Sequence, residues 1–385
     1  MKSLTSLVLL SLLGPAHAGD GAKSGLHSSS RASSGWTLQS ISAGPAWRSL
    51  GSLDYKGGSN SANFLIPSLI GGDALNLPAI GTPGVIGDRL YNDGFVNLDG
   101  TSSTDGDTWY WGYDSASQVS GNNLLFSATG SRSAYQESRN FSGNINDHDS
   151  LEALTPQIDF LLAPPSSNSL PFDGLLISFW AFSDDSNNRF SNFTANQTRD
   201  DFSLDFSDTY DVSAITPVIG APYTGSAGGP GPIISNLPTD RTRDDVLIGS
   251  DSADFTNTIS TSLDLEGYSL AVGPTWQGGF GTNWIWQASA GVTFNLFKWN
   301  ARETEVLSYS LNGAPPVEFN RWQDSKSGSD FRLGLYAKGE VIHQLTDDWF
   351  AKGYLQLEIA DSIDIDVGNS QYEFKPRGYA LGHNF

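Results

Sequence analysis

Asn146-Asp147-His148-Asp149 is the stretch of this sequence whose side chains could activate a water molecule. An aspartate next to a histidine can support the imidazole as a general base. The sequence holds neither the G-x-S-x-G pattern of serine hydrolases nor the H-E-x-x-H pattern of zinc proteases. Because the stretch falls in a polar segment, residues 128–154, a solvated loop explains it best. We therefore expect no catalytic residues and no enzyme, and an outer-membrane hydrolase is the least favoured function.

Two groups of aspartates offer oxygen atoms to a calcium ion. They are Asp99, Asp105 and Asp107 in the first group, and Asp361, Asp364 and Asp366 in the second. Neither group has the regular spacing and distal glutamate of a calcium loop. Turn chemistry explains the first group, and a short rim strand over residues 363–367 explains the second. The expectation is that the chain binds no metal and no cofactor.

The composition narrows the classes of partner. The 385 residues include 42 acidic and 21 basic side chains, no cysteine and a formal net charge of -21. A chain without cysteine has no disulfide framework and no thiolate metal site. The acidic balance argues against a nucleic-acid partner, which requires a basic surface.

The N-terminus carries the features of a secretory signal. Lys2 is followed by an apolar run at residues 7–13 and by Ala16-His17-Ala18, which matches an A-x-A cleavage site. We predict a signal peptide at residues 1–18, cleaved after Ala18, and then a disordered tail of small polar residues at 19–35. The later apolar runs are shorter than the ~18–20 residues that a membrane helix requires.

Alternation of apolar and polar residues dominates the remaining sequence and is clearest at residues 331–358. The odd positions there are apolar, the even positions carry the charges, and a tight polar turn at 344–348 joins two segments. A period of two predicts strands with one apolar and one polar face. Twelve strands are expected, at residues 36–55, 89–98, 108–114, 119–127, 155–163, 172–182, 202–210, 256–276, 284–299, 331–343, 349–358 and 376–385. Long connections are expected at 128–154, 183–201, 212–255, 300–330 and 361–375, and their role is left open.

One of these segments changes its apolar phase. Leu263 and Leu265 are odd, whereas Tyr268, Leu270 and Val272 are even, and Gly267 lies between them. A slip of one residue at a glycine predicts a β-bulge.

The chain resembles the outer-membrane β-barrel proteins of diderm bacteria, in the manner of porins. The resemblance rests on the signal, the alternating strands, aromatics at strand ends and a final phenylalanine, Phe385, with Leu381 and Tyr379 on the same phase. It implies an all-β fold: one antiparallel transmembrane barrel over residues 36–385, with about 12 strands (10–14 possible) and long extracellular loops. It also implies an outer-membrane location, with the lipid bilayer, lipopolysaccharide and the outer-membrane assembly machinery as partners. Phe385, Leu381 and Tyr379 would form the assembly signal. No subfamily is matched, and the oligomeric state stays open.

In such a barrel the charged phase of residues 331–358 faces the lumen, because a basic side chain facing lipid costs ~2–4 kcal/mol. The expected lumen residues are Arg332, Lys338, Glu340, Lys352 and Glu358. If the lumen is open, they line a passive pore; if they pair and pack, the barrel is a closed, surface-structural body. The sequence leaves both alternatives open.

A secreted, soluble β-sandwich that binds glycans is the alternative, since it also predicts alternating strands. The aromatic run Trp109-Tyr110-Trp111 could stack on sugar rings, but we assign it to the aromatic girdle at a membrane interface. Segments of about 12–20 residues exceed the ~5–6 residues typical of globular sheets, which favours the barrel.

Overall fold

The computed structural model describes residues 35–100, 106–165, 170–215 and 219–384. The predicted signal peptide at 1–18, the predicted tail up to residue 34, Asp105 and Phe385 lie outside these residues. The described chain is all-β with a large antiparallel sheet, as predicted. Within it, no helix is both long and apolar enough to cross a membrane.

The regular elements of the described residues are twenty strands and two short 3-10 turns, η1 (Ser61–Asn63) and η2 (Ala116–Gln118). The strands are β1 (Thr37–Gly57), β2 (Ala74–Asn76), β3 (Arg89–Tyr91), β4 (Gly94–Val96), β5 (Asp107–Thr108), β6 (Trp111–Tyr113), β7 (Val119–Ser120), β8 (Asn123–Phe141), β9 (Ile145–Ala163), β10 (Gly174–Phe190), β11 (Phe193–Asp211), β12 (Tyr223–Thr224), β13 (Ile234–Ser235), β14 (Asp240–Phe280), β15 (Trp284–Leu311), β16 (Val317–Gln344), β17 (Phe350–Ala360), β18 (Ile363–Val367), β19 (Ser370–Lys375) and β20 (Arg377–Asn384).

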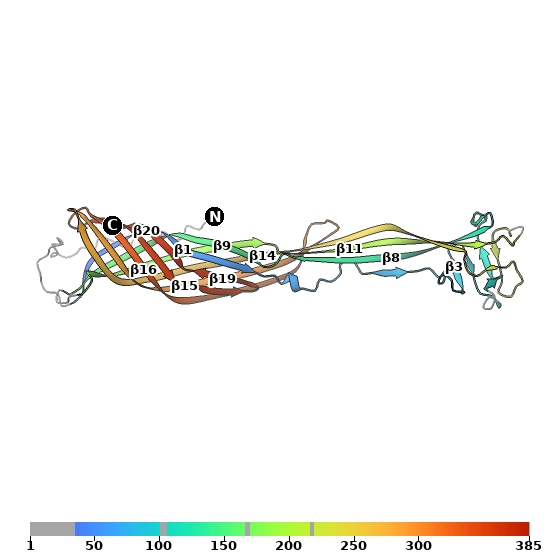
Figure 1. Cartoon of the computed structure of the whole chain (residues 1–385), viewed down its shortest axis with the longest axis horizontal. Coiled ribbons are helices and arrows are strands. Elements are labelled where there is room, and N and C mark those ends of the chain that lie inside the picture. The colour runs from blue at the N-terminus through green and yellow to red at the C-terminus, as the bar shows by residue number, and fades with distance from the viewer. Residues whose placement is uncertain (1–34, 101–105, 166–169, 216–218, 385) are drawn as a thin grey trace.

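The molecule is elongated and has three parts, which Figure 1 shows along its long axis. A wide body at one end contains β1, β9, β15, β16 and β20, and a narrow stalk leads from it to a small head around β3. β14 belongs to both the body and the stalk: its 41 residues measure roughly 135 Å along their path at ~3.3 Å per residue. β8 and β11 complete the stalk, because β11 pairs with both β8 and the first half of β14.

Much of the sequence that we expected to form loops is strand. Residues 128–154 lie mostly in β8 and β9, residues 183–201 in β10 and β11, and β14 begins at Asp240, so these three predictions are wrong. The expected loop at 300–330 is also wrong, because β15 and β16 continue to a hairpin at 312–316. In the middle of the stalk, most residues of β8, β11 and β14 are exposed or half-buried at odd and even positions alike. No single apolar face exists there to produce a period of two.

Eight strands of the body pair in a closed ring: β1, β9, β10, β14, β15, β16, β17 and β20. Each of them corresponds to one of the twelve predicted segments. The other four segments, at 89–98, 108–114, 119–127 and 202–210, lie in the head and the stalk, so the predicted count of about twelve barrel strands is wrong. The turns at 281–283 and 345–349 lie at the same end of the ring as Thr37 and Asn384.

The apolar residues change faces along single ring strands without any slip in register. In β14, Leu263 and Leu265 are 1% and 2% exposed and point inward, whereas Leu270 and Trp276 are 39% and 40% exposed and point outward. Gly267 pairs in unbroken register with Phe182 and Phe297, so the predicted β-bulge at this glycine is wrong. The inward face simply changes from apolar to polar along the strand.

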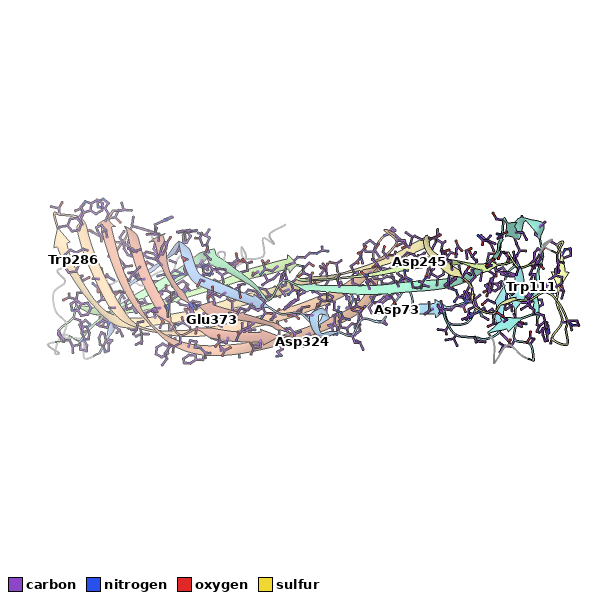
Figure 2. All side chains as sticks on the ribbon, turned by 45° about the vertical axis from the view of Figure 1, so that its right-hand side comes forward. Asp73, Trp111, Asp245, Trp286, Asp324 and Glu373 are labelled. Atoms are coloured by element: carbon purple, nitrogen blue, oxygen red, sulfur yellow. The ribbon has the colours of Figure 1, made fainter. Side chains whose placement is uncertain are left out.

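The outward apolar residues form a belt around the ring at the end with the short turns. Every ring strand contributes to this belt, with Trp47, Leu154, Phe179, Leu270, Phe294, Leu335, Leu357 and Leu381 as exposed representatives. Figure 2 places Trp286, an exposed member of the belt, at the far end of the body from the stalk. Polar side chains fill the inside of the ring at this level, among them Ser269, Thr293 and Asn295.

Beyond the belt, the ring opens into two facing sheets. The β9–β10 ladder spans Gln157/Trp180 to Leu162/Leu175, and the next residue of β9, Pro156, has no N–H for a further bond. One sheet then contains β10, β14, β15 and β16, and the other contains β9, β1, β19 and β18. An apolar core fills the space between them, with Leu53, Tyr55, Ile365 and Phe374 from one side and Leu263, Leu265 and Phe297 from the other.

The short rim strand predicted at 363–367 is confirmed as β18. The connection expected around it is instead the β18–β19 hairpin, in which Ile363 pairs with Phe374 and Val367 with Ser370. Ile363, Ile365 and Val367 are buried in the apolar core, while Asp364 and Asp366 point to the solvent.

The head comprises residues 77–122 and 212–239. Its core contains Trp111 and Tyr113 and is completed by Phe126 of β8 and Tyr210 of β11, from the end of the stalk. Its largest sheet has the order β12-β6-β4-β3. Trp111 is fully buried there, at the opposite end of the molecule from Trp286 (Figure 2). The assignment of the run 109–111 to a girdle around the barrel is therefore wrong.

Candidate functional site

A cluster of two lysines and two carboxylates occupies the inside of the ring at the level of the belt. Lys338 and Glu340 come from β16, Lys352 from β17 and Asp159 from β9. The Nζ atoms of Lys338 and Lys352 each lie 2.7 Å from Oδ2 of Asp159, and they lie 2.8 Å and 3.0 Å from Oε1 of Glu340. Each lysine therefore bridges both acids, and the four charges sum to zero.

Neutral side chains bind the remaining oxygen atoms of both acids. Asp159 accepts hydrogen bonds from Ser178 Oγ (2.6 Å), Gln157 Nε2 (2.9 Å) and Asn384 Nδ2 (3.2 Å), and Glu340 accepts one from Gln287 Nε2 (2.7 Å). These residues lie on five different strands of the ring. A buried charge is stable only when it is paired and hydrogen-bonded, and this cluster meets both conditions.

A second ion pair lies next to the cluster. Arg48 of β1 pairs with Glu358 of β17, donates from Nη2 to Oε1 of Gln157 over 2.7 Å, and lies 4.4 Å from the ring centroid of Trp180. Tyr354 also donates to Oε1 of Gln157, over 2.9 Å. The guanidinium of Arg48 is thus bound at its edge and on its planar face. Gln157 links this ion pair to the lysine–carboxylate cluster, because it contacts both Arg48 and Asp159.

Four of the five residues that the sequence analysis expects in the lumen belong to these clusters in the structure: Lys338, Glu340, Lys352 and Glu358. Arg332 lies outside both clusters, six residues before Lys338 on β16, and is half-buried. It pairs with Asp330 over 3.2 Å and donates a hydrogen bond from Nε to the carbonyl oxygen of Ser362. Whether any of the five lines a pore stays a prediction.

Sequence reasoning missed the partners Asp159 and Arg48. Arg48 does fall on the non-apolar phase of its strand, which was a usable signal. Asp159, in contrast, falls on the same alternate positions of β9 as Leu161 and Ala163, because the inward face of this strand becomes apolar toward its end. The alternation therefore does not mark Asp159 as an inward charge.

The arrangement fills the ring rather than exposing a reactive group. Eight strands enclose an interior just wide enough for side chains. A void between Arg48, Trp180 and Glu358 on one side and Leu50, Phe182 and Phe297 on the other measures about 20 Å³, room for roughly one water molecule. Within the described residues, no three His, Asp or Glu side chains are placed to share a metal ion.

The stretch at 146–149 is not a loop but part of β9, at the end of that strand nearer the stalk. His148 is exposed, and its Nδ1 contacts Oδ1 of Asp54. The other oxygen of Asp54, Oδ2, accepts a hydrogen bond from Lys375. Ordinary cross-strand pairing explains this Lys–Asp–His surface network, because His148 and Asp54 are direct neighbours on β9 and β1. The geometry assembles no nucleophile beside the imidazole.

The head contacts the stalk at a buried ion pair between two neighbouring stalk strands, and we call this junction the neck. Asp208 of β11 is fully buried and accepts from Nε and Nη2 of Arg241 over 2.5 Å each and from the Tyr91 hydroxyl over 2.5 Å. Arg241 of β14 also donates to the carbonyls of Ile80 and Gly81 in the head. A bidentate pair fixes orientation as well as distance, here between β11 and β14. The hydrogen bonds of Tyr91, Ile80 and Gly81 attach the head to this pair.

The neck should lose stability at alkaline pH. Burial raises the pKa of Tyr91 and raises the pKa of Tyr210 to about 12, against about 10 in an unfolded chain. Raised values mean that the folded state holds these protons more tightly, so the stabilisation is complete below pH 10 and declines as the pH rises through 10 toward 12. Urea unfolding at several alkaline pH values should show this decline, and Tyr210→Phe should reduce it. An identical decline in both proteins would contradict the assignment.

No model of a known protein family matches the chain, and no curated protein sequence matches it at a significant level. The basis for a functional proposal is therefore the arrangement of the residues themselves.

Proposed function

We propose that this chain is an outer-membrane β-barrel protein that displays its head at a distance from the cell surface, with the ring as a closed membrane anchor. The observation that carries the proposal is the exchange of faces along β14. The apolar residues before Gly267 in the sequence point inward and those after it point outward, in one unbroken register. A strand in uniform solvent has no reason to exchange its faces. A strand that leaves a bilayer for water does, because its outer surroundings change from lipid to water.

The dimensions of the belt support the proposal. On β16 the exposed apolar residues run from Phe331 to Val341, and roughly 9–11 tilted residues span a bilayer. The short turns and both described chain ends lie at the belt end, as expected for the periplasmic side of bacterial barrels. The stalk and head then extend from the outer surface, and lipopolysaccharide surrounds the belt.

The secreted β-sandwich accounts for the two facing sheets but not for the belt. In water, the belt would expose large apolar side chains on all eight ring strands, and soluble monomers rarely expose apolar patches larger than a few hundred Å². A bilayer removes that cost, and the outer-membrane assembly machinery would insert the strands. Tyr379 and Leu381 are exposed on the outer face of β20, where such a machinery could read them together with Phe385.

The ion clusters favour a closed anchor over a passive pore. Lys338 and Glu340 are each about 3% exposed, and their charged atoms are bound to one another and to Asp159. Ions crossing the ring would have to break a network that spans its diameter. The role that remains is surface-structural: the stalk positions the head, and the chain catalyses no reaction.

Planar-bilayer recording tests the closed anchor. The purified chain should insert without stepwise conductance, because the clusters fill the ring. The variant Lys338→Ala/Lys352→Ala, which removes both bridging side chains, is expected to conduct if it inserts. Regular conductance steps from the unaltered protein, with a selectivity that changes in Lys338→Glu/Lys352→Glu, would show instead that these residues line a pore.

A further inference from the structure

The outward face of the β12-β6-β4-β3 sheet in the head carries a platform of two half-buried aromatic rings and one exposed leucine. The register pairs Leu90 with Phe95 and Phe95 with Gly112, and Asn97 and Tyr110 are linked as the next pair by a 2.9 Å backbone hydrogen bond. Residues paired across antiparallel strands share one face. Leu90, Phe95 and Tyr110 therefore lie side by side, on the face opposite to buried Trp111.

A glycine determines how the platform lies. A Cβ atom at residue 112 would lie 2.8 Å from Cε1 of Phe95 and 2.7 Å from the carbonyl oxygen of Tyr223. Without a side chain there, the Phe95 ring lies across the sheet. Tyr110 packs edge-on against it, with ring centroids 5.2 Å apart. Leu90 extends the apolar surface and is 63% exposed.

Polar groups border the platform on the same face. Asp88 lies immediately before β3, two residues from Leu90, and Asn97 lies immediately after β4, two residues from Phe95. Thr224 pairs with Gly112. Successive residues alternate faces in a strand, so positions two apart share a face. A carboxylate, an amide and a hydroxyl therefore offer hydrogen-bond donors and acceptors at the rim of an aromatic surface.

The charge of the head restricts the ligand. Its described residues include the acids Asp88, Asp93, Asp99, Asp107 and Asp114 and one basic side chain, Arg89, which is fully buried. An acidic surface repels polyanions. A flat aromatic surface bordered by neutral and acidic hydrogen-bonding groups suits a ring with one C–H face and several hydroxyls.

We infer that this platform, formed by Leu90, Phe95 and Tyr110 and bordered by Asp88, Asn97 and Thr224, binds a neutral glycan by stacking of a pyranose ring. The inference goes beyond the membrane anchor and does not require it, because the platform lies entirely within the head.

Glycan-array binding of the full chain in detergent tests the site, with neutral β-glucan, mannan and galactan oligosaccharides as probes and heparin and polygalacturonate as anionic comparators. At least one neutral series should bind. Phe95→Ala and Tyr110→Ala should each weaken binding roughly tenfold or more, whereas Tyr110→Phe retains the ring and should bind nearly as well. Phe141→Ala removes an exposed aromatic side chain outside the head and should leave affinity unchanged.

Thermal unfolding of each variant controls for loss of the fold. If Phe95→Ala destabilises the head, Asn97→Ala decides the matter, because it removes a rim amide and should still weaken binding severalfold. The same sugars carried on lipid in vesicles distinguish a membrane glycolipid from a free polysaccharide as the source of the ligand. The inference is overturned if no neutral glycan binds, if only the anionic comparators bind, or if folded Tyr110→Ala and Asn97→Ala bind like the unaltered chain.

Discussion

Replacement of Asp159 by alanine is expected to lower the free energy of unfolding by about 3–5 kcal/mol, the usual cost of removing one partner from a buried ion pair. Asp159 binds both lysines of the cluster and is 2% exposed. Without it, Lys338 and Lys352 share one carboxylate, Glu340, and the inside of the ring carries an unbalanced positive charge. Urea unfolding in detergent or in vesicles measures the loss.

Two controls separate the cluster from a general effect of mutation. Asp244→Ala removes an exposed aspartate of the stalk and should change stability by no more than about 0.5 kcal/mol. Asp159→Ala/Lys352→Met restores charge balance, because Lys338 then pairs with Glu340 alone, and it should recover part of the lost stability. A loss below 1 kcal/mol for Asp159→Ala would show that the cluster does not hold the ring strands together.

Replacement of Leu335 by arginine should destabilise the protein in a bilayer by ~2–4 kcal/mol, the cost of a basic side chain at the bilayer midplane. Leu335 is 60% exposed in the middle of the belt. The exposure makes the substitution informative: in water an arginine at so exposed a position is tolerated, whereas in lipid it is not. Equilibrium unfolding from vesicles, or the yield of inserted protein, measures the effect.

Ser327→Arg is the matched control, because Ser327 lies eight residues earlier on β16, is exposed, and points to the same side as Leu335. It lies beyond the belt and should tolerate the charge. Equal effects of the two substitutions would mean that both positions face the same solvent, which contradicts a membrane-spanning belt.

The strands of the ring could be predicted from sequence because each lies between two different surroundings. The hairpin of β16 and β17 shows this best: outward-facing, exposed Leu335 and Leu357 alternate with inward, buried Lys338 and Gln356. The period of two is strong wherever one face is apolar and the other polar. The signal is weaker in residues 172–182, the segment that contains most of the ring part of β10, because they are apolar at odd and even positions alike.

The stalk and the exchange of faces could not be predicted by the same rule. The middle parts of β8 and β11 are exposed or half-buried at most odd and even positions alike, so they carry no period. Residues 202–210, at the end of β11 near the head, do alternate and were predicted as a strand. In β14, a change in the surroundings of the strand produced the same signature as a slip in register. A single sequence does not distinguish the two cases, because both move the apolar residues from odd to even positions.

The candidate site was predictable in part, for a related reason. Lys338, Glu340, Lys352 and Glu358 stand out because a charge interrupts an otherwise apolar strand. Their partner Asp159 comes from a strand almost 180 residues earlier, and the pairing depends on the closure of the ring rather than on any local pattern. The neck depends on tertiary contacts in the same way.

Site-specific labelling tests the central claim most directly, because the chain contains no cysteine and one introduced thiol is a unique label. An environment-sensitive fluorophore is attached at Leu335→Cys in the belt, Ser327→Cys beyond it and Asp88→Cys in the head, in vesicles that contain nitroxide-labelled lipid. The membrane anchor predicts blue-shifted emission that the lipid quenches at residue 335, and water-like, unquenched emission at residues 327 and 88. Water-like emission at all three positions would contradict it.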